Sequence, residues 1–257
     1  MSARFDQHFL VDRKAIERIA ETIGVEGRTV LEIGPGQGAL TAALLHRGAK
    51  VVGVELDAGL LEALSERFSR EIGEGRLALV HGDAVSCPLP EFDAVVSNLP
   101  YSASSKITFR LLENGFEEAV LMYQSEFADR MLAPAGTPAC GRLSIMVQTY
   151  CAVRKVFDLP PRAFSPRPKV RSTVLHIVPR EPLFPIEDRD LYARVVRALF
   201  AHRRKTVRNC LKSAGSLLDR ELVERLLEDL PDEVLAARPE ELYLEDFATI
   251  ANRGGRE

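Results

Sequence analysis

The sequence predicts an α/β fold: a mostly parallel β-sheet with helices on its faces, followed by a small all-helical C-terminal domain. Short apolar runs rich in β-branched residues alternate with helix-like stretches, and this strand pattern stops after Pro179. Strands that alternate with helices form βαβ units, in which the strands run parallel and the helices cover the sheet. The 257 residues suffice for one large domain, or for one medium domain with a smaller appendage.

The first part of the chain carries the expected sheet. The apolar runs predict strands over residues 30–33, 51–55, 77–80, 92–97 and 119–123. The stretches between them predict helices over residues 39–47, 58–72 and 102–114. Two later strands, 153–159 and 173–178, are joined by a proline-rich loop too short for a crossover helix. We therefore expect them to form an antiparallel pair at the end of the sheet.

The remaining residues read as helices. The expected segments are 188–200, 203–214, 219–230 and 239–252. Pro182 and Pro185 mark the joint that precedes them. We therefore expect two domains, residues 1–180 and residues 181–257.

Charge is distributed unevenly along the chain. Residues 1–151 carry 14 basic and 20 acidic residues, residues 152–212 carry 15 and 5, and residues 213–257 carry 5 and 12. The basic middle block is typical of a protein that binds a polyanion, although a solvated helix face with acidic partners would give the same pattern. The four cysteines have no metal-binding spacing, and no apolar run reaches the roughly 18 residues of a membrane span. We expect no metal, no membrane insertion and a cytoplasmic location.

A glycine-rich turn joins the first strand to its helix. The run Gly34-Pro35-Gly36-Gln37-Gly38 lets backbone approach a ligand closely, and the following helix N-terminus presents free N–H groups. Glu55, at the end of the second strand, is placed to accept hydrogen bonds from both hydroxyls of a ribose. NAD and S-adenosylmethionine both carry such a ribose, so these residues do not distinguish the two cofactors.

Two later strand ends favour S-adenosylmethionine. The third strand leads to Asp83, which can receive an adenine amino group, and the fourth ends in Asn98-Leu99-Pro100-Tyr101. An exocyclic amine on a purine is a poor nucleophile because its lone pair is delocalised. An amide oxygen and a backbone carbonyl that accept from its N–H groups favour the tetrahedral nitrogen that can attack a methyl group, and the aromatic ring stacks on the base. This tetrapeptide is the most specific signal in the chain.

With these residues in hand, the sequence resembles the ribosomal RNA adenine N6,N6-dimethyltransferase family of the KsgA type over nearly its whole length. Residues 6–10 resemble the family's opening motif, which closes over the cofactor. Residues 164–172 resemble its target-side loop, and residues 199–209 the signature that opens its helical domain. His8 departs from the pattern, since bacterial relatives usually have Asn there. Either side chain can donate a hydrogen bond to the methionine part of the cofactor.

The resemblance implies a Rossmann-like class I methyltransferase sheet with S-adenosylmethionine as the methyl donor. The implied target is two adjacent adenosines near the 3′ end of small-subunit rRNA. We expect a monomeric enzyme that methylates them within a pre-ribosomal 30S-type particle, during ribosome biogenesis. The expected cofactor-binding residues are His8, Leu10, Gly34, Gly36, Glu55, Asp83, Ala84 and Asn98. The expected catalytic residues are Asn98, Leu99, Pro100 and Tyr101. The expected RNA-binding residues are Arg167, Lys169, Arg203, Arg204, Lys205 and Arg208.

Three other interpretations stay open at this point. Enzymes of the erythromycin-resistance type modify large-subunit rRNA with the same chemistry, although residues 166–170 and 200–208 favour the small-subunit family. A non-enzymatic ribosome-assembly factor would keep the fold as a binding module. The glycine turn with Glu55 is also compatible with an NAD-dependent dehydrogenase.

Overall fold

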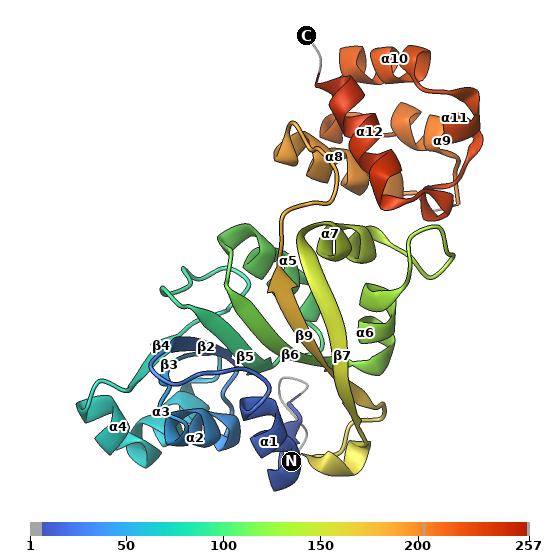
Figure 1. The fold of residues 1–257 in the computed structure, drawn as a ribbon. Coiled ribbons are helices and arrows are strands. Elements are labelled where there is room, and N and C mark those ends of the chain that lie inside the picture. Colours follow the sequence, from blue (N-terminus) through green and yellow to red (C-terminus); the bar gives the residue numbers. More distant parts are fainter. Residues whose placement is uncertain (1–6, 203, 256–257) are drawn as a thin grey trace. The chain divides into compact units, whose positions relative to one another are not determined.

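The computed structural model describes residues 7–202 and 204–255 (Figure 1). The chain forms two compact units, Met1–Ala128 with Val153–Pro179 and Asp129–Ala152 with Arg180–Glu257. The longer segment of the second unit begins at Arg180, next to the predicted domain joint. The second unit also includes residues 129–152, which the sequence analysis assigns to the first domain. The division at residue 180 stays a proposal. No helix within the described ranges is both long and apolar enough to cross a bilayer.

A seven-stranded sheet runs through the first unit, in the order β4-β3-β2-β5-β6-β9-β7. Its strands are β2 (Thr29–Ile33), β3 (Lys50–Glu55), β4 (Leu77–His81), β5 (Ala94–Asn98), β6 (Glu118–Gln124), β7 (Cys151–Leu159) and β9 (Ser172–Pro179). Strands β2 to β6 pair in parallel, whereas β9 pairs antiparallel with β6. The predicted fold class, a mostly parallel sheet with an antiparallel end, is confirmed.

The strand order reverses between β2 and β5, because the chain builds β3 and β4 on one side of β2 and then crosses to the other. Ligands of open α/β sheets bind where the carboxyl ends of the strands diverge at such a switch point. The end of β2, which leads into the glycine turn, and the end of β5, which is Asn98, are the two strand ends that meet there.

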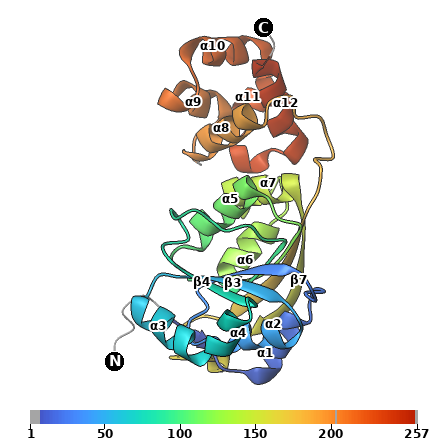
Figure 2. The same ribbon diagram turned by 90° about the vertical axis from the view of Figure 1, so that its left-hand side faces the viewer.

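The helices of the first unit are α1 (Arg13–Ala20), α2 (Ala39–His46), α3 (Ala58–Arg67), α4 (Ser69–Gly73) and α5 (Ser104–Asn114), and α6 (Ser125–Leu132) begins in the first unit and ends in the second. In Figure 2 the sheet separates α1–α4 from α5. The predicted helix 58–72 is two helices, because Phe68 leaves helical geometry at φ −111° and ψ 26° and buries its ring in the core. That core is formed by apolar residues such as Ile19, Val30 and Leu44.

The second unit is helical in its described part. Its helices are α7 (Arg142–Tyr150), α8 (Arg189–Phe200), α9 (Val207–Lys212), α10 (Arg220–Asp229), α11 (Asp232–Ala236) and α12 (Leu244–Gly254). Tyr192, Leu199 and Phe247 are fully buried in its core. Single 3-10 turns lie at Pro161–Ala163 in the first unit and at Gly215–Leu217 and Pro239–Glu241 in the second.

The predicted helix 203–214 is wrong in its first turn. Arg204 and Lys205 lie in a turn and a bend, Thr206 is extended at φ −68° and ψ 161°, and α9 begins only at Val207. Threonine is favoured in the extended position before a helix, and neighbouring cations repel one another along a helical turn. The described basic residues before Val207 are therefore presented from a turn and not from a helix face.

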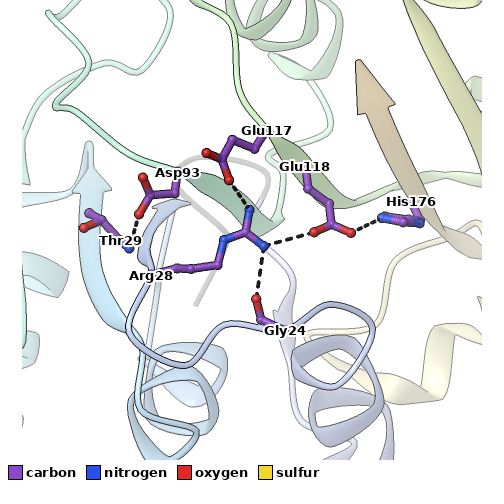
Figure 3. A network of polar contacts seen from close by, with 7 residues as sticks. All are labelled: Gly24, Arg28, Thr29, Asp93, Glu117, Glu118 and His176. Atoms are coloured by element: carbon purple, nitrogen blue, oxygen red, sulfur yellow. Dashed lines mark hydrogen bonds and ion pairs between the residues drawn. The ribbon is translucent and has the colours of Figure 1, made fainter. Parts of the chain in front are cut away.

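A polar network closes the amino edge of the sheet, where the parallel strands begin (Figure 3). Arg28 donates to Glu117, to Glu118 and to the carbonyl of Gly24, at 3.0, 3.0 and 3.1 Å. His176 Nε2 lies 2.6 Å from the other oxygen of Glu118. These contacts join the segment before β2 to the start of β6 and to β9.

Candidate functional site

A cavity of about 420 Å³ opens at the carboxyl ends of β2, β3, β4 and β5. Most of its lining comes from five segments: the N-terminal stretch 7–10, the end of β2 with its glycine turn, the end of β3, the turn after β4, and the motif that follows β5. The helices α2, α3 and α5 contribute further residues. This is the size of pocket that encloses a small-molecule cofactor. Every residue predicted for cofactor binding and every residue predicted for catalysis lines this one cavity.

The glycine turn and Glu55 are tied together. The N–H of Gly36 donates to Glu55 Oε2 at 3.0 Å, and the N–H of Asp57 donates to Glu55 Oε1 at 3.0 Å. Gly36 has φ +58°, and a Cβ there would lie 2.9 Å from two ring carbons of Phe9. Glycine is therefore required at this position. Because each carboxylate oxygen can accept a second hydrogen bond, Glu55 is held in place and can still receive hydroxyl groups.

Glu32 is a site residue that the sequence analysis did not single out. It lines the cavity, is 2% exposed, and accepts a 2.6 Å hydrogen bond from the hydroxyl of Thr41. Burial raises the pKa of Glu32 to about 8, the hydrogen bond from Thr41 opposes this rise, and the charge of Glu55 adds to it. The available signal was an acid inside the otherwise apolar run Val30-Leu31-Glu32-Ile33.

The turn after β4 carries the predicted adenine-binding residues. Asp83 Oδ1 accepts from the N–H of Val85 at 2.8 Å, and the Asp83 carbonyl accepts from Ser86 and Cys87 at 2.9 and 2.7 Å. Asp83 is exposed, whereas Ala84 is buried. The turn therefore presents one carboxylate and one small apolar side chain to the cavity.

Asn98 has a defined orientation. Its Nδ2 donates to the carbonyl of His8 at 3.1 Å, which directs the donor half of the amide toward the N-terminal segment. Its Oδ1 is buried and accepts no hydrogen bond within the described part of the chain. A buried acceptor without a donor is costly in a folded protein and marks a place where a ligand can supply one.

The rest of the motif surrounds this acceptor. Tyr101 Oη and Ser172 Oγ share a 2.6 Å hydrogen bond, and the Tyr101 ring lies 5.7 Å from the His8 ring. The Pro100 carbonyl already accepts from the N–H of Ala103 and the hydroxyl of Ser104. Leu99 is 1% exposed as a whole residue, and it lines the cavity.

A two-stranded ribbon, which the sequence does not predict, joins two of the family-like motifs. Strand β1 (Phe9–Leu10) pairs antiparallel with β8 (Phe164–Ser165). His8 Nδ1 donates to the carbonyl of Pro166 at 2.9 Å, and the N–H groups of Val11 and Asp12 both donate to the carbonyl of Ala163. The opening motif and the target-side loop are thus one connected piece of structure, except that Asp6 lies outside the described residues.

The predicted RNA-binding residues fall into two groups. Arg167 and Lys169 are exposed in the loop after β8, in the first unit. Arg204, Lys205 and Arg208 belong to the second unit, and Arg203 lies outside the described residues. Lys205 Nζ donates to Ser213, and Arg208 forms a 2.8 Å ion pair with Asp232. Their contact with RNA stays a prediction.

The cavity residues fit an adenosyl cofactor. The glycine at position 36 lets the turn pass close to Phe9 and Glu55, Glu55 can accept two hydroxyls, and the Asp83 turn offers an acceptor beside a small side chain. The buried Oδ1 of Asn98 adds an acceptor at the same cavity. These donors and acceptors correspond to a ribose, an adenine and an incoming amine.

Comparison with known proteins agrees with the site. A sequence model of the family described as "Ribosomal RNA adenine dimethylase" matches residues 1–251. A protein of Methanospirillum hungatei JF-1 named "Probable ribosomal RNA small subunit methyltransferase A" is 59% identical over 253 residues, which cover 98% of this chain and 99% of that protein. A protein of the same name from Halobacterium salinarum is 42% identical over 249 residues, with 96% and 88% covered.

Two solved structures are similar over the same length. A dimethyladenosine transferase from Plasmodium falciparum has a TM-score of 0.78 and 29% identity, covering 96% of this chain and 98% of that chain. The 23S rRNA methyltransferase ErmE has a TM-score of 0.65 and 30% identity, covering 96% and 100%. S-adenosylmethionine is the cofactor of this group of enzymes. The chain belongs to the ribosomal RNA adenine dimethylase family.

Proposed function

We propose that the protein dimethylates the N6 amino groups of two adjacent adenosines near the 3′ end of small-subunit rRNA, with S-adenosylmethionine as methyl donor. The observation that carries the proposal is the buried, unpartnered Oδ1 of Asn98 at the carboxyl end of β5, inside the cavity. The names of the relatives from M. hungatei and H. salinarum support the small-subunit target.

The proposed cofactor residues divide by chemistry. Glu55 would accept the ribose hydroxyls, Asp83 and Ala84 would receive the adenine, and the turn at Gly34 and Gly36 would pass beneath the cofactor. The remaining residues of this proposed set are His8, Leu10 and Asn98. When bound, S-adenosylmethionine supplies a methyl group already activated by its sulfonium. The protein therefore has to bind and orient, and it has no need to activate the donor.

Two acceptors would hold the target amine. Asn98 Oδ1 would accept one N–H, and the carbonyl of Leu99 would accept the other, because the Pro100 carbonyl is already engaged by Ala103 and Ser104. Acceptors that draw on both N–H bonds favour the tetrahedral nitrogen whose lone pair points away from the base. In many enzymes, preorganised dipoles of this kind make the largest single contribution to the rate enhancement.

The backbone of His8 fixes which end of the amide faces the substrate. Because Nδ2 of Asn98 is engaged by the His8 carbonyl, the oxygen is the end that is left to accept. The ring of Tyr101 would stack on the target adenine, and its hydroxyl is anchored by Ser172. The motif supplies acceptors and a stacking surface but no base, so the amine proton passes to solvent.

The proposal extends to the setting of the reaction. We propose that rRNA is recognised within a pre-ribosomal 30S-type particle, in the cytoplasm, by a monomer. The exposed Arg167 and Lys169 and the cluster Arg203, Arg204, Lys205 and Arg208 would contact phosphates. Their charges suit a polyanion that is much larger than the methylated base.

Large-subunit rRNA is the second candidate, because ErmE has the same fold at 30% identity. The higher TM-score of the dimethyladenosine transferase and the names of the archaeal relatives favour the small subunit. The dehydrogenase interpretation is excluded by membership of the family.

Mapping methylated nucleosides tests the proposal. The protein would be incubated with S-adenosylmethionine and with unmodified small or large ribosomal subunits, and the rRNA would be digested for mass spectrometry. We expect N6,N6-dimethyladenosine at two adjacent positions of the small-subunit rRNA alone. Modification confined to the large subunit, or monomethyladenosine as the only product at long times, would overturn it.

A further inference from the structure

Arg110 lies in α5, the helix that begins just after the Asn98–Tyr101 motif. Its guanidinium reaches the turn after β4. Nη1 donates to the carbonyl of Ala84 at 2.8 Å, and Nη2 donates to the carbonyl of Cys87. Arg110 is half-buried and does not itself line the cavity.

Both carbonyls belong to one tight turn, with Ala84 inside it and Cys87 at its end. Within it, the Asp83 carbonyl accepts from Ser86 and Cys87, and the Asp83 side chain accepts from Val85. A Cβ at Gly82 would lie 2.9 Å from Cβ of Cys87, so the two ends of the turn are in contact. These bonds shape the turn internally, whereas Arg110 connects it to a helix.

The planar guanidinium is suited to this task. Its donors form a rigid fork, so two hydrogen bonds to separate carbonyls fix the distance and the angle between α5 and the turn. The ammonium of a lysine is a single point on a flexible stem and cannot reproduce both bonds at once.

We propose that Arg110 is a positioning residue that holds the Asp83–Cys87 turn in the geometry that receives the adenine of the cofactor. The inference rests on the proposed assignment of Asp83 and Ala84 to the adenine. It connects the two halves of the site, because α5 starts at the target-amine motif and Arg110 anchors the cofactor turn to that helix.

The experiment measures S-adenosylmethionine binding by titration calorimetry, with thermal melting in parallel. The variants are Arg110→Ala, Arg110→Lys, Asp83→Ala and the double variant Asp83→Ala with Arg110→Ala. Arg70→Ala is the matched control, since Arg70 is exposed, lies on α4 in the same unit and forms a local ion pair with Glu74. Steady-state kinetics add the KM for the cofactor, the KM for RNA and kcat.

We expect Arg110→Ala to weaken binding about tenfold or more, Arg110→Lys to lie in between, and Arg70→Ala to match the wild type. The KM for the cofactor should rise while the KM for RNA stays the same. Since Arg110 acts through the turn, its loss should reduce the affinity for S-adenosylmethionine less when Asp83 is already absent. The double variant should therefore bind the cofactor less tightly than Asp83→Ala, but by a factor smaller than about ten.

The outcomes separate the two claims. If Asp83→Ala binds the cofactor like the wild type, the assignment of Asp83 fails and the inference fails with it. If Asp83→Ala weakens binding but neither Arg110 variant does, only the inference fails. An equal loss from Arg110→Ala in both backgrounds would also overturn it, because the effect would then not pass through Asp83. Should Arg110→Ala not fold, Arg110→Lys carries the same test.

Discussion

The two edges of the central sheet differ in how their polar groups are hydrogen-bonded. At the amino edge, Arg28, Glu118 and His176 are satisfied by one another, and Asp93 accepts from the backbone of Thr29 (Figure 3). At the carboxyl edge, Asn98 Oδ1 has no donor within the described residues and Glu32 sits buried with a raised pKa. Paired groups stabilise a fold, and unsatisfied or perturbed groups are expected where a ligand completes the structure. Substitutions at the amino edge should therefore lower the free energy of unfolding, and most substitutions at the carboxyl edge should lower cofactor affinity or kcat.

The largest effect is expected from Asn98→Ala. Removing a preorganised group that stabilises the reacting atoms typically lowers kcat by about 100-fold or more. RNA binding should survive. Asn114→Ala is the control, because Asn114 lies at the other end of α5 and its amide donates to the carbonyl of Arg110. A single-turnover rate within a factor of a few of the wild type would contradict the assigned role of Asn98.

Glu55→Ala should come next, with an effect on cofactor affinity. Charge-assisted hydrogen bonds contribute about 1.5–3 kcal/mol each, so the loss of even one of them predicts weakening by at least about tenfold. Titration calorimetry with S-adenosylmethionine measures it. Glu117→Ala, at the amino edge, should leave the affinity unchanged. If both variants bind equally well, the ribose assignment is wrong.

Arg28→Ala tests the amino edge. Glu118 and the Gly24 carbonyl both accept hydrogen bonds from Arg28, and this variant removes that shared donor. We expect a loss of about 1–3 kcal/mol in the free energy of unfolding. Chemical denaturation measures this loss. Well below the melting temperature, kcat should equal that of the wild type. A lowered kcat in fully folded Arg28→Ala would show that the two edges are not independent.

Glu32→Gln should change the pH dependence of stability. The folded pKa of about 8 lies above the ordinary value of 4.5, so between these pH values the unfolded chain loses this proton while the folded chain keeps it. Wild-type stability should therefore fall from about pH 5 to pH 8, by an amount of order 1 kcal/mol or more. In Glu32→Gln this contribution should be absent, because the amide of Gln does not titrate, and its oxygen can still accept the hydrogen bond from Thr41. Denaturation measured at several pH values in this range gives the free energy of unfolding of both proteins. The same pH dependence in both would contradict the assignment of a buried proton to Glu32.

The smallest effects are expected at the exposed cations. Arg167→Ala and Lys169→Ala should each remove one phosphate neighbour and so lower the slope of log affinity against log salt by about 0.7–0.9. Arg208→Ala should lower it less, because Arg208 is already paired with Asp232. RNA binding assays across a salt series measure this. Slopes that are unchanged in all three variants would support ordinary surface charge.

Local patterns in the sequence identify residues that the fold brings to one cavity, and pairing between distant segments explains what these patterns miss. The strands and the residues at their ends, such as Glu55, Asp83 and Asn98, follow from apolar periodicity and from the shared edge of a parallel sheet. The β1–β8 ribbon depends on segments more than 150 residues apart, for which no local pattern exists. The raised pKa of Glu32 depends on burial, which arises only when the helices pack on β2.

The ribbon also sets the order in which the cavity can be completed as the chain is made. Strand β1 contributes to the cavity wall but pairs with residues 164 and 165, so its hydrogen bonds have no partner until those residues have been synthesised. At the usual rate of about 5–20 residues per second, this interval is roughly 10–30 s. The glycine turn, the Asp83 turn and Asn98 are all translated before it ends. The N-terminal wall of the cavity is therefore the first part of the site to be translated and among the last to be fixed in place.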